Sequence, residues 1–575
     1  MVRSGVVNRG GVGPARWRAG LAAAALALPL ATVHHTGQAV PGLPRDKTLY
    51  ASGTATSPPS SFNPLDPAKA YTGTQGLLYE PLFLYDPVHG RFIPWLATGG
   101  NWVSATTYRL QVRNGVSWAT SPGGTASGML TGADVAYSIN LAVTDKEDPY
   151  NADVTSVKSA VAVGDTVTVA FTRPTDYAQW QQFLFEAPII PEAVWSKLTP
   201  DAQVGGANTA PVSTGPMLLV STNENEACYR DNPDWWARIQ LGLSFKFEYL
   251  CDLVTHSSGD DLSALLDNRT DWSNELLRGV PNLVGGKTNA YGIKTYFPAA
   301  PYMLPAGTAW LEMDTAKAPM NNVDFRRAVA YAIDPSAVIS GVYTGTVTAA
   351  NPTGLLPYLS PFINNVAVKS YGFQYSPSMA KQFLDKSGYQ GQHLTLEVPL
   401  GWTDWMGAAT ELADQLDKAG IHVSAKFVPL GTRNADLSAG TYDMAIVDNS
   451  GIGPTPWSYF DAVYHLPVNA VQNPSMNAER YSDPSAWLLV RQAATTPVTD
   501  TALLRSIYAV VEADFLQELP VVPLWYSGAW FQASTAYWKN YPASTSRQDQ
   551  FTPMMGNGWL GSTTTVYALA NLKPH

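Results

Sequence analysis

The sequence contains few charged residues and only two cysteines. Of its 575 residues, 36 are Lys or Arg and 46 are Asp or Glu, so charged side chains make up 14%, against about 25% in an average soluble protein. The formal net charge of −10 provides no basic stripe for a nucleic-acid backbone. No apolar run beyond residue 39 approaches the ~18 residues that a membrane span needs. These features exclude a nucleic-acid-binding protein and a membrane-embedded fold.

The first 39 residues have the three-part pattern of a secretory signal peptide. Their only charged side chains are four arginines, Arg3, Arg9, Arg16 and Arg18. An apolar stretch over residues 19–33 leads to Gly37-Gln38-Ala39, a small-x-small cleavage site. The alternative is a membrane anchor, for which this Ala-rich stretch is short. We therefore expect an exported, extracytoplasmic protein, in the cell envelope, in the periplasm or secreted, and without the lipobox cysteine of a lipid-anchored chain.

The side chains that usually hold metals are scarce. Export places Cys228 and Cys251 in an oxidising compartment, where two thiols usually form a disulfide; the alternative is two separate buried thiols. Two cysteines alone do not make a zinc site. Five scattered histidines remain beyond the signal peptide and before the last residue: His89, His256, His393, His422 and His465. We expect no metal site, no catalytic triad and no cofactor.

The hydrophobic pattern predicts an α/β chain. Alternating or β-branched segments predict strands at 48–53, 108–113, 166–171, 422–427 and 442–447. Periodic apolar residues predict helices at 74–79, 323–333, 378–387 and 407–419, with a further helix starting after Thr131 as its N-cap. The strand–helix–strand order in the second half favours parallel pairing through a crossover helix.

Several short motifs occur in a familiar order. They are Phe62-Asn63-Pro64, Tyr79-Glu80-Pro81-Leu82, Thr214-Gly215-Pro216, Asn232-Pro233-Asp234-Trp235-Trp236 and Phe325-Arg326-Arg327-Ala328. This collinear set resembles the extracytoplasmic solute-binding proteins of ABC importers, in the oligopeptide-binding family (solute-binding protein family 5). The resemblance covers essentially the whole chain after the signal peptide. It implies a two-lobe periplasmic-binding-protein-like fold with mixed sheets, a hinge between the lobes and an extra subdomain in the first lobe.

The resemblance also implies domain boundaries. We expect a signal peptide at 1–39, lobe 1 at 40–72 and 195–307, an inserted subdomain of lobe 1 at 73–194, lobe 2 at 308–529 and a return to lobe 1 at 530–575. Most of the shared motifs are scaffold. We expect Arg326 and Arg327 to form surface ion pairs and the Asn232–Trp236 motif to be a turn with an aromatic plug.

Tryptophans gather in Gly- and Pro-containing segments after residue 400. We expect the ligand to contact Trp402, Asp404, Trp405, Asn449, Trp457, Asp461, Trp525, Tyr526 and Trp530. Loops at strand ends are where α/β sheets bind ligands, and a pyranose offers an apolar face to an indole and hydroxyls to a carboxylate or amide. The alternative for each tryptophan is packing in a core or hinge.

The predicted function is capture of a solute, not catalysis. The Trp-rich stretches at 401–406 and 525–531 look like the branch of the family that binds cello-, xylo- or manno-type oligosaccharides. An oligopeptide is the alternative, although Asp448-Asn449-Ser450-Gly451 lacks the paired acidic residues that peptide binders of the family carry there. A lower alternative is an exported carbohydrate-active enzyme. The expected partner is an ABC permease in the membrane, and we expect a monomer.

Overall fold

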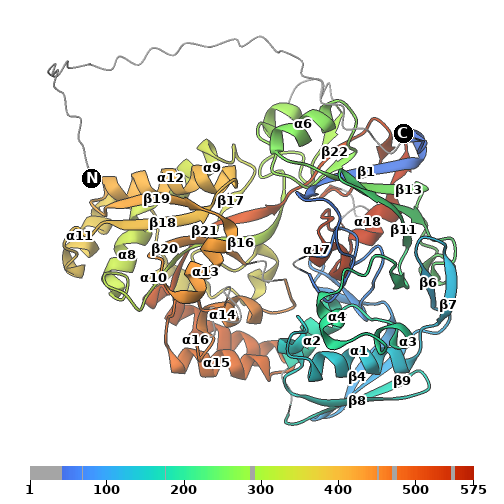
Figure 1. The fold of residues 1–575 in the computed structure, drawn as a ribbon. Coiled ribbons are helices and arrows are strands. Elements are labelled where there is room, and N and C mark those ends of the chain that lie inside the picture. Colours follow the sequence, from blue (N-terminus) through green and yellow to red (C-terminus); the bar gives the residue numbers. More distant parts are fainter. Residues whose placement is uncertain are drawn as a thin grey trace, which may run out of the picture. The chain divides into compact units, whose positions relative to one another are not determined.

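Two β-sheets of mixed strand direction organise the structure, which is a computed structural model (Figure 1). It describes residues 42–575 except 68, 175–176, 285–291, 450–451, 469–475 and 546–550. The expected signal peptide lies outside the described residues. Leu43–His575 is one compact unit. Among the described residues, no helix has both the length and the apolar character that crossing a bilayer requires.

The first sheet has seven strands in the order β11-β12-β13-β1-β14-β22-β15, and we call the part built on it lobe 1. The strands are β1 Thr48–Ala55, β11 Met217–Asn223, β12 Glu226–Asp231, β13 Tyr249–Val254, β14 Trp272–Ser273, β15 Ile293–Lys294 and β22 Gln532–Ser534. Strand β1 runs parallel to β13 and β14, while the other pairs are antiparallel. Cys228 and Cys251 lie opposite each other on β12 and β13 and form a disulfide.

The segment between β1 and β11 adds smaller sheets to lobe 1. A four-stranded sheet has the order β4-β5-β9-β8, a three-stranded sheet β10-β6-β7, and β2 pairs with β3. These strands are β2 Phe83–Asp86, β3 Arg91–Pro94, β4 Ala97–Ser104, β5 Thr107–Val112, β6 Ser117–Thr120, β7 Thr125–Met129, β8 Val157–Val163, β9 Thr166–Phe171 and β10 Val212–Ser213. Helix α1, Gly132–Thr144, starts with the capping box of Thr131 and Asp134. The strand predictions at 108–113 and 166–171 and the helix after Thr131 are confirmed.

The second sheet has six strands in the order β17-β21-β16-β20-β18-β19, and we call the part built on it lobe 2. The strands are β16 Leu304–Met313, β17 Thr348–Ala349, β18 Leu394–Pro399, β19 Val423–Val428, β20 Met444–Asn449 and β21 Val521–Ala529. Strand β18 is parallel to β19 and β20, and β16 is antiparallel to β20 and β21. Helix α12, Thr403–Lys418, is the crossover between β18 and β19 and buries Ala409, Leu412 and Leu416 against them, as the strand–helix–strand pattern predicts.

The remaining helices cover these sheets and the connections between them. They are α2 Tyr177–Glu186, α3 Glu192–Trp195, α4 Pro200–Gly205, α5 Trp236–Gln240, α6 Ser258–Leu266, α7 Val280–Val284, α8 Val323–Ala332, α9 Pro335–Gly341, α10 Asn365–Tyr371, α11 Pro377–Ser387, α13 Leu430–Ala439, α14 Trp457–Tyr464, α15 Pro484–Ala494, α16 Thr501–Glu518, α17 Asn557–Ser562 and α18 Thr565–Asn571. Strands β23 Trp538–Lys539 and β24 Lys573–Pro574 pair near the C-terminus.

Two sequence predictions about this scaffold are wrong. Residues 74–79 form turns instead of a helix, because Gly73 and Gly76 take positive φ angles of 90° and 93°, which end regular helical geometry. At Gly76 a Cβ atom would lie 2.5 Å from the backbone oxygen of Leu560. Tight contact with the C-terminal segment therefore decides this region, and local periodicity does not reveal such a contact.

Arg326 is also buried, with 3% of it exposed, and not at the surface as expected. The expected ion pair is present, because Nη2 of Arg326 lies 3.8 Å from Oε2 of Glu518. Nε of Arg326 donates to the carbonyl oxygens of Glu518 and Leu519, each at 3.0 Å. These carbonyls lie at the end of α16, where the last turn lacks intrahelical donors. Arg327 also makes an ion pair, with Asp324 at 3.6 Å. Arg326 thus caps α16, which fixes the long helix that precedes β21.

Glu80 joins motifs that are far apart in the sequence. The carboxylate is buried and accepts hydrogen bonds from the indole N–H groups of Trp95, Trp235 and Trp236 at 2.9, 3.1 and 3.0 Å. The Thr214 hydroxyl donates to it at 2.8 Å. Four donors thus converge on one buried carboxylate, which explains why the Glu-Pro and Asn-Pro-Asp-Trp-Trp motifs occur together. The aromatic plug predicted for Trp235 and Trp236 is confirmed, since both rings are 1% exposed.

The chain passes between the two sheets twice. Strand β15 of lobe 1 leads to β16 of lobe 2, and β21 of lobe 2 leads to β22 of lobe 1. Only Trp530 and Phe531 separate β21 from β22. Any ligand held between the lobes therefore lies next to these two crossings.

Buried carboxyl groups predict that the protein is most stable in mild acid. Burial raises the pKa of Glu80, Asp148 and Asp252 to about 7 and that of Glu512 to about 8, whereas unfolded carboxyls titrate near 4. Between about pH 4.5 and 7 the folded chain therefore binds more protons than the unfolded chain, and the free energy of unfolding falls as pH rises. Scanning calorimetry should give a higher Tm at about pH 5 than at about pH 8. A Tm that rises between about pH 5 and pH 8 would contradict the raised pKa values of these buried carboxyl groups.

Candidate ligand-binding site between the lobes

Tyr343 lies at the centre of the main aromatic group. It follows α9, and only 2% of it is exposed. Its ring centroid is 5.3 Å from that of Trp525, and it stacks on Trp530 at 6.2 Å with an interplanar angle of 10°. Its hydroxyl donates to Oδ2 of Asp404 at 3.3 Å. The structure thus brings three of the predicted residues together around a tyrosine that the sequence analysis did not select.

Helix α12 begins four residues earlier than predicted, which changes the roles of its first residues. Trp402 occupies the N-cap position and its carbonyl accepts from the Met406 amide at 2.8 Å. Asp404 lies in the first turn, where the helix dipole favours a negative charge. Trp405 is consequently a helix residue and only 7% exposed. The segment 401–406 is therefore the start of a helix, and not a loop in front of one.

Trp402 is the exposed member of an aromatic pair. It is 44% exposed, and its ring centroid lies 4.9 Å from that of Trp405 in an edge-to-face arrangement of 76°. The guanidinium carbon of Arg433 lies 5.7 Å from the centroid of the Trp405 ring. Trp405 is thus held between Trp402 and a cation, and it gives Trp402 a rigid support.

Asp404 and Asp448 form an acidic pair beside Tyr343. Burial raises the pKa of Asp404, while nearby backbone amides, Tyr343 and Arg278 lower it. Burial raises the pKa of Asp448 to about 6, the hydrogen bond with Ser527 lowers it, and the charge of Asp404 raises it. Gly307 on β16 leaves room for Asp448, because a Cβ there would lie 2.1 Å from Asp448 Oδ1.

Lobe 1 contributes the segment after β14 to the same site. Leu276 packs in the hydrophobic cluster of lobe 2, and Nη2 of Arg278 donates to the carbonyl oxygen of Thr403 at 3.4 Å. Burial is the main cause that raises the pKa of Glu275, and the charges of Asp261 and Asp404 raise it further. Both lobes thus place charged groups around the N-terminus of α12.

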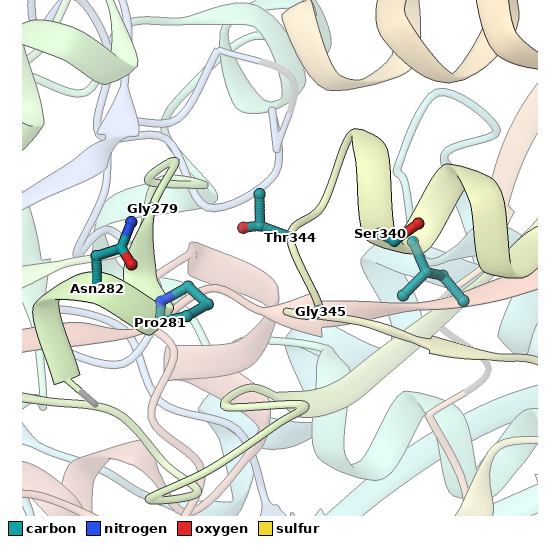
Figure 2. A pocket seen from close by; sticks show the side chains of 7 residues that line it. Gly279, Pro281, Asn282, Ser340, Thr344 and Gly345 are labelled. Atoms are coloured by element: carbon teal, nitrogen blue, oxygen red, sulfur yellow. The ribbon is translucent and has the colours of Figure 1, made fainter. Parts of the chain in front are cut away.

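A pocket of about 450 Å³ lies between the start of α7 and the end of α9. Figure 2 shows Gly279, Pro281 and Asn282 around the start of α7 on one side, and Ser340, Thr344 and Gly345 around the end of α9 on the other. Ile339 completes the lining. The volume is within the range of about 300–1,000 Å³ for small-molecule sites. The lining is uncharged and offers hydroxyl, amide and backbone groups to a ligand.

Trp525 and Tyr526 are structural in this arrangement. Trp525 is 0% exposed in the core of lobe 2. The Tyr526 hydroxyl donates to the Leu355 carbonyl at 2.7 Å and accepts from the Asn351 amide at 2.9 Å. Side chains of β21 alternate between the sheet faces, and both faces are covered here. The structure therefore gives these two residues packing roles instead of the direct ligand contacts expected from the sequence.

Trp457 and Asp461 lie in a separate group on α14. They are 8% and 4% exposed, and Nδ1 of His465 is 3.3 Å from Oδ1 of Asp461. Burial raises the pKa of Asp153 in lobe 1, and the charges of Glu186 and Asp461 raise it further. These residues therefore mark a second contact between the lobes.

A hydrophobic cluster accompanies this second contact. Ile452 of lobe 2 packs with Tyr85, Phe185 and Trp559 of lobe 1, and the Tyr85 hydroxyl donates to the Gly453 carbonyl at 3.2 Å. Asn449 ends β20 opposite Thr308 and is half-buried. The predicted residues are thus divided between the Tyr343 group, this contact and β20.

Sequence reasoning missed Tyr343, Arg278 and the pocket lining. Tyr343 is followed by Thr344-Gly345, the same pattern of an aromatic beside a glycine turn that selected the tryptophans. That signal was present at Tyr343 and would have identified it. Arg278 carries no comparable signal, because its contact is with a residue 125 positions away.

The chain is similar to solved and curated binding proteins along most of its length. A structure of the periplasmic oligopeptide-binding protein of an oligopeptide ABC transporter from Thermotoga maritima is 36% identical, covers 92% of this chain and 100% of its own, and has a TM-score of 0.86. Its mannohexaose-bound form has the same identity, coverages of 92% and 99%, and a TM-score of 0.83. The probable ABC transporter periplasmic-binding protein SapA of Escherichia coli is 24% identical over 85% of this chain and 90% of its own.

These similarities confirm the two-lobe α/β fold with mixed sheets expected from the sequence. The profile of the bacterial extracellular solute-binding proteins, family 5 Middle, matches residues 91–469, more than half of the chain. Proteins of this family bind solutes for transport, and the family is not one of enzymes. The chain therefore belongs to the bacterial extracellular solute-binding proteins of family 5, the solute-binding components of ABC transporters.

Proposed function

We propose that the protein captures an uncharged oligosaccharide of the cello, xylo or manno type between its lobes and delivers it to an ABC permease. The carrying observation is the exposed indole of Trp402, supported by Trp405 at the edge of the candidate site. A pyranose packs its C–H face on an indole, and a rigid aromatic supplies this area at low cost in conformational entropy. Exposed tryptophan with a buried aromatic behind it is suited to that contact.

The polar groups near Trp402 suit a ligand rich in hydroxyls. Asp404 is two residues away and shares a hydrogen bond with Tyr343, which leaves its other oxygen for an acceptor role. Ser340, Thr344 and Asn282 line the pocket with neutral groups. A sugar hydroxyl both donates and accepts, so it can pair with each of these groups.

The neighbour from Thermotoga maritima supports the same ligand class. It is called an oligopeptide-binding protein, yet one of its structures holds mannohexaose. At 36% identity over 92% of this chain, it is a relative in which this scaffold accommodates a hexasaccharide.

An oligopeptide is the second candidate ligand. The observation that favours it is the acidic pair of Asp404 and Asp448, because a ligand ammonium would offset the burial and the charge of Asp404 that raise the pKa of Asp448. Curated relatives include a di/tripeptide-binding protein of Pseudomonas aeruginosa, 22% identical over 80% of this chain and 86% of its own. The two ligand classes differ in whether a positive charge is recognised.

The proposed mechanism is closure of the lobes on the ligand. Contacts already join the lobes at Leu276, at the Arg278–Thr403 hydrogen bond and at Tyr85–Gly453. A ligand that contacts both lobes favours the closed arrangement by its differential affinity. We further propose that the chain is exported by residues 1–39, acts as a monomer, uses no cofactor and catalyses no reaction.

Replacing Trp402 by Ala should weaken binding of mannohexaose about 30-fold and leave the Tm nearly unchanged, because truncating an anchoring aromatic costs about 2 kcal/mol. Trp525→Ala should do the reverse. It removes a fully buried ring and should lower the free energy of unfolding by about 3–5 kcal/mol, with little effect on the affinity of the folded protein. Calorimetric titration and thermal melting on the same samples measure both quantities.

Tyr375→Ala is the matched control for Trp402→Ala, because Tyr375 is a 51% exposed aromatic of lobe 2 outside the site. Its affinity for mannohexaose should equal that of the wild type. If Trp402→Ala binds as tightly as this control, the indole is not a ligand contact and the central argument for a sugar fails.

Asp448→Asn distinguishes the two ligand classes. An amide still accepts a hydrogen bond from a hydroxyl, so oligosaccharide binding should weaken less than about fivefold. A charge-assisted hydrogen bond to an ammonium is worth about 1.5–3 kcal/mol, so a peptide ligand should bind at least about tenfold more weakly. Titration with mannohexaose, a tetrapeptide and its N-acetylated form gives the comparison. Tight binding of the free tetrapeptide alone, lost on acetylation and in Asp448→Asn, would establish the peptide alternative.

A further inference from the structure

A second pocket, of about 370 Å³, lies within lobe 1 and shares no lining residue with the first pocket. The lining residues that matter here are Lys294, Thr295, Thr535, Lys539 and Tyr541. They come from β15 and the chain after it, from the link between β22 and β23, and from β23 and the chain after it. All of the described lining residues belong to lobe 1.

The charged side chains among the described lining residues are both positive. They are Lys294 and Lys539, and none of the described lining residues carries a carboxylate. Within the described ranges, neither lysine forms an ion pair with an acidic side chain. Lys573 lies directly opposite Lys539 in the β23–β24 pair, and like charges in that position destabilise a sheet. Three lysines gather here in a chain with a formal net charge of −10.

Three hydroxyl groups around the lysines already donate hydrogen bonds to backbone carbonyls. Thr295 donates its hydroxyl to the Phe297 carbonyl at 2.7 Å, and Thr535 donates to the Gly292 carbonyl at 2.8 Å. The Tyr541 hydroxyl bonds to the Ser534 carbonyl at 3.0 Å. These oxygens can still accept, but their protons are committed to the backbone. The ammonium groups are therefore the charged donors that this lining offers to a ligand.

We infer that this pocket binds a phosphate-bearing anion. Lysine ammonium groups act as compact point charges on phosphate oxygens, and a bound anion would relieve the repulsion between Lys539 and Lys573. The pocket volume suits a group the size of a phosphorylated headgroup. The same chemistry is offered by free phosphate and by an anionic lipid headgroup. The second source would hold the protein at the membrane surface.

Two probes distinguish these sources. Inorganic phosphate is titrated into the protein by calorimetry at constant ionic strength, and cosedimentation is measured with vesicles of phosphatidylglycerol or of phosphatidylcholine. The wild type should bind phosphate, or phosphatidylglycerol vesicles in preference to phosphatidylcholine vesicles. Lys294→Gln/Lys539→Gln should lose at least about tenfold in affinity for whichever probe binds, and either single variant should lose less.

Lys146→Gln/Lys158→Gln is the matched control, because it removes two exposed lysines elsewhere in lobe 1. It should bind the probes as the wild type does, and all variants should keep the wild-type Tm. If the wild type binds neither inorganic phosphate nor phosphatidylglycerol vesicles, the inference is overturned. An equal loss in both double variants would overturn it too, since binding would then follow the net charge. Neither result bears on oligosaccharide capture, which involves other residues.

Discussion

The stacking of Trp530 on Tyr343 fixes the crossing between the lobes beside the candidate ligand-binding site. Trp530 lies in the two-residue link between a strand of lobe 2 and a strand of lobe 1. It packs against the hydrophobic clusters of both lobes, and the Asn274 side chain of lobe 1 donates to its carbonyl at 2.6 Å. Gly528 makes room for the ring, because a Cβ there would lie 2.9 Å from it. These contacts therefore hold the crossing in place where it faces Tyr343, and the candidate site lies beside it.

Around this crossing the structure separates recognition from support. Trp525, Trp405 and Tyr526 are buried and hold the surrounding strands and helix in place. Trp402, at the N-cap of α12, remains exposed. Because rigid support limits the entropy lost on binding, a single exposed indole with a fixed orientation is a better anchor than several mobile rings. The second contact, at Tyr85 and Ile452, adds to closure at a distance from this anchor.

Much of the scaffold could be predicted from sequence because its signals are local. The strands at 108–113 and 166–171 alternate apolar and polar residues, and Thr131 with Asp134 forms a capping box. The site was predicted less well. The sequence identifies tryptophans near glycine and proline, but exposure depends on which strand covers which, so Trp525 and Trp402 could not be told apart. Arg326 and Arg278 depend on partners distant in sequence, which local patterns do not reveal, whereas Tyr343 carries a local signal in the glycine turn that follows it.

The central claim is that the lobes close on an oligosaccharide. Small-angle X-ray scattering tests it most directly, by comparing the radius of gyration of the protein alone, with saturating mannohexaose and with a saturating tetrapeptide. A ligand that binds between two lobes stabilises the closed arrangement, which is more compact. The account predicts that the radius of gyration decreases with mannohexaose and stays the same with the tetrapeptide. A radius that decreases only with the tetrapeptide, or with neither ligand, would contradict it.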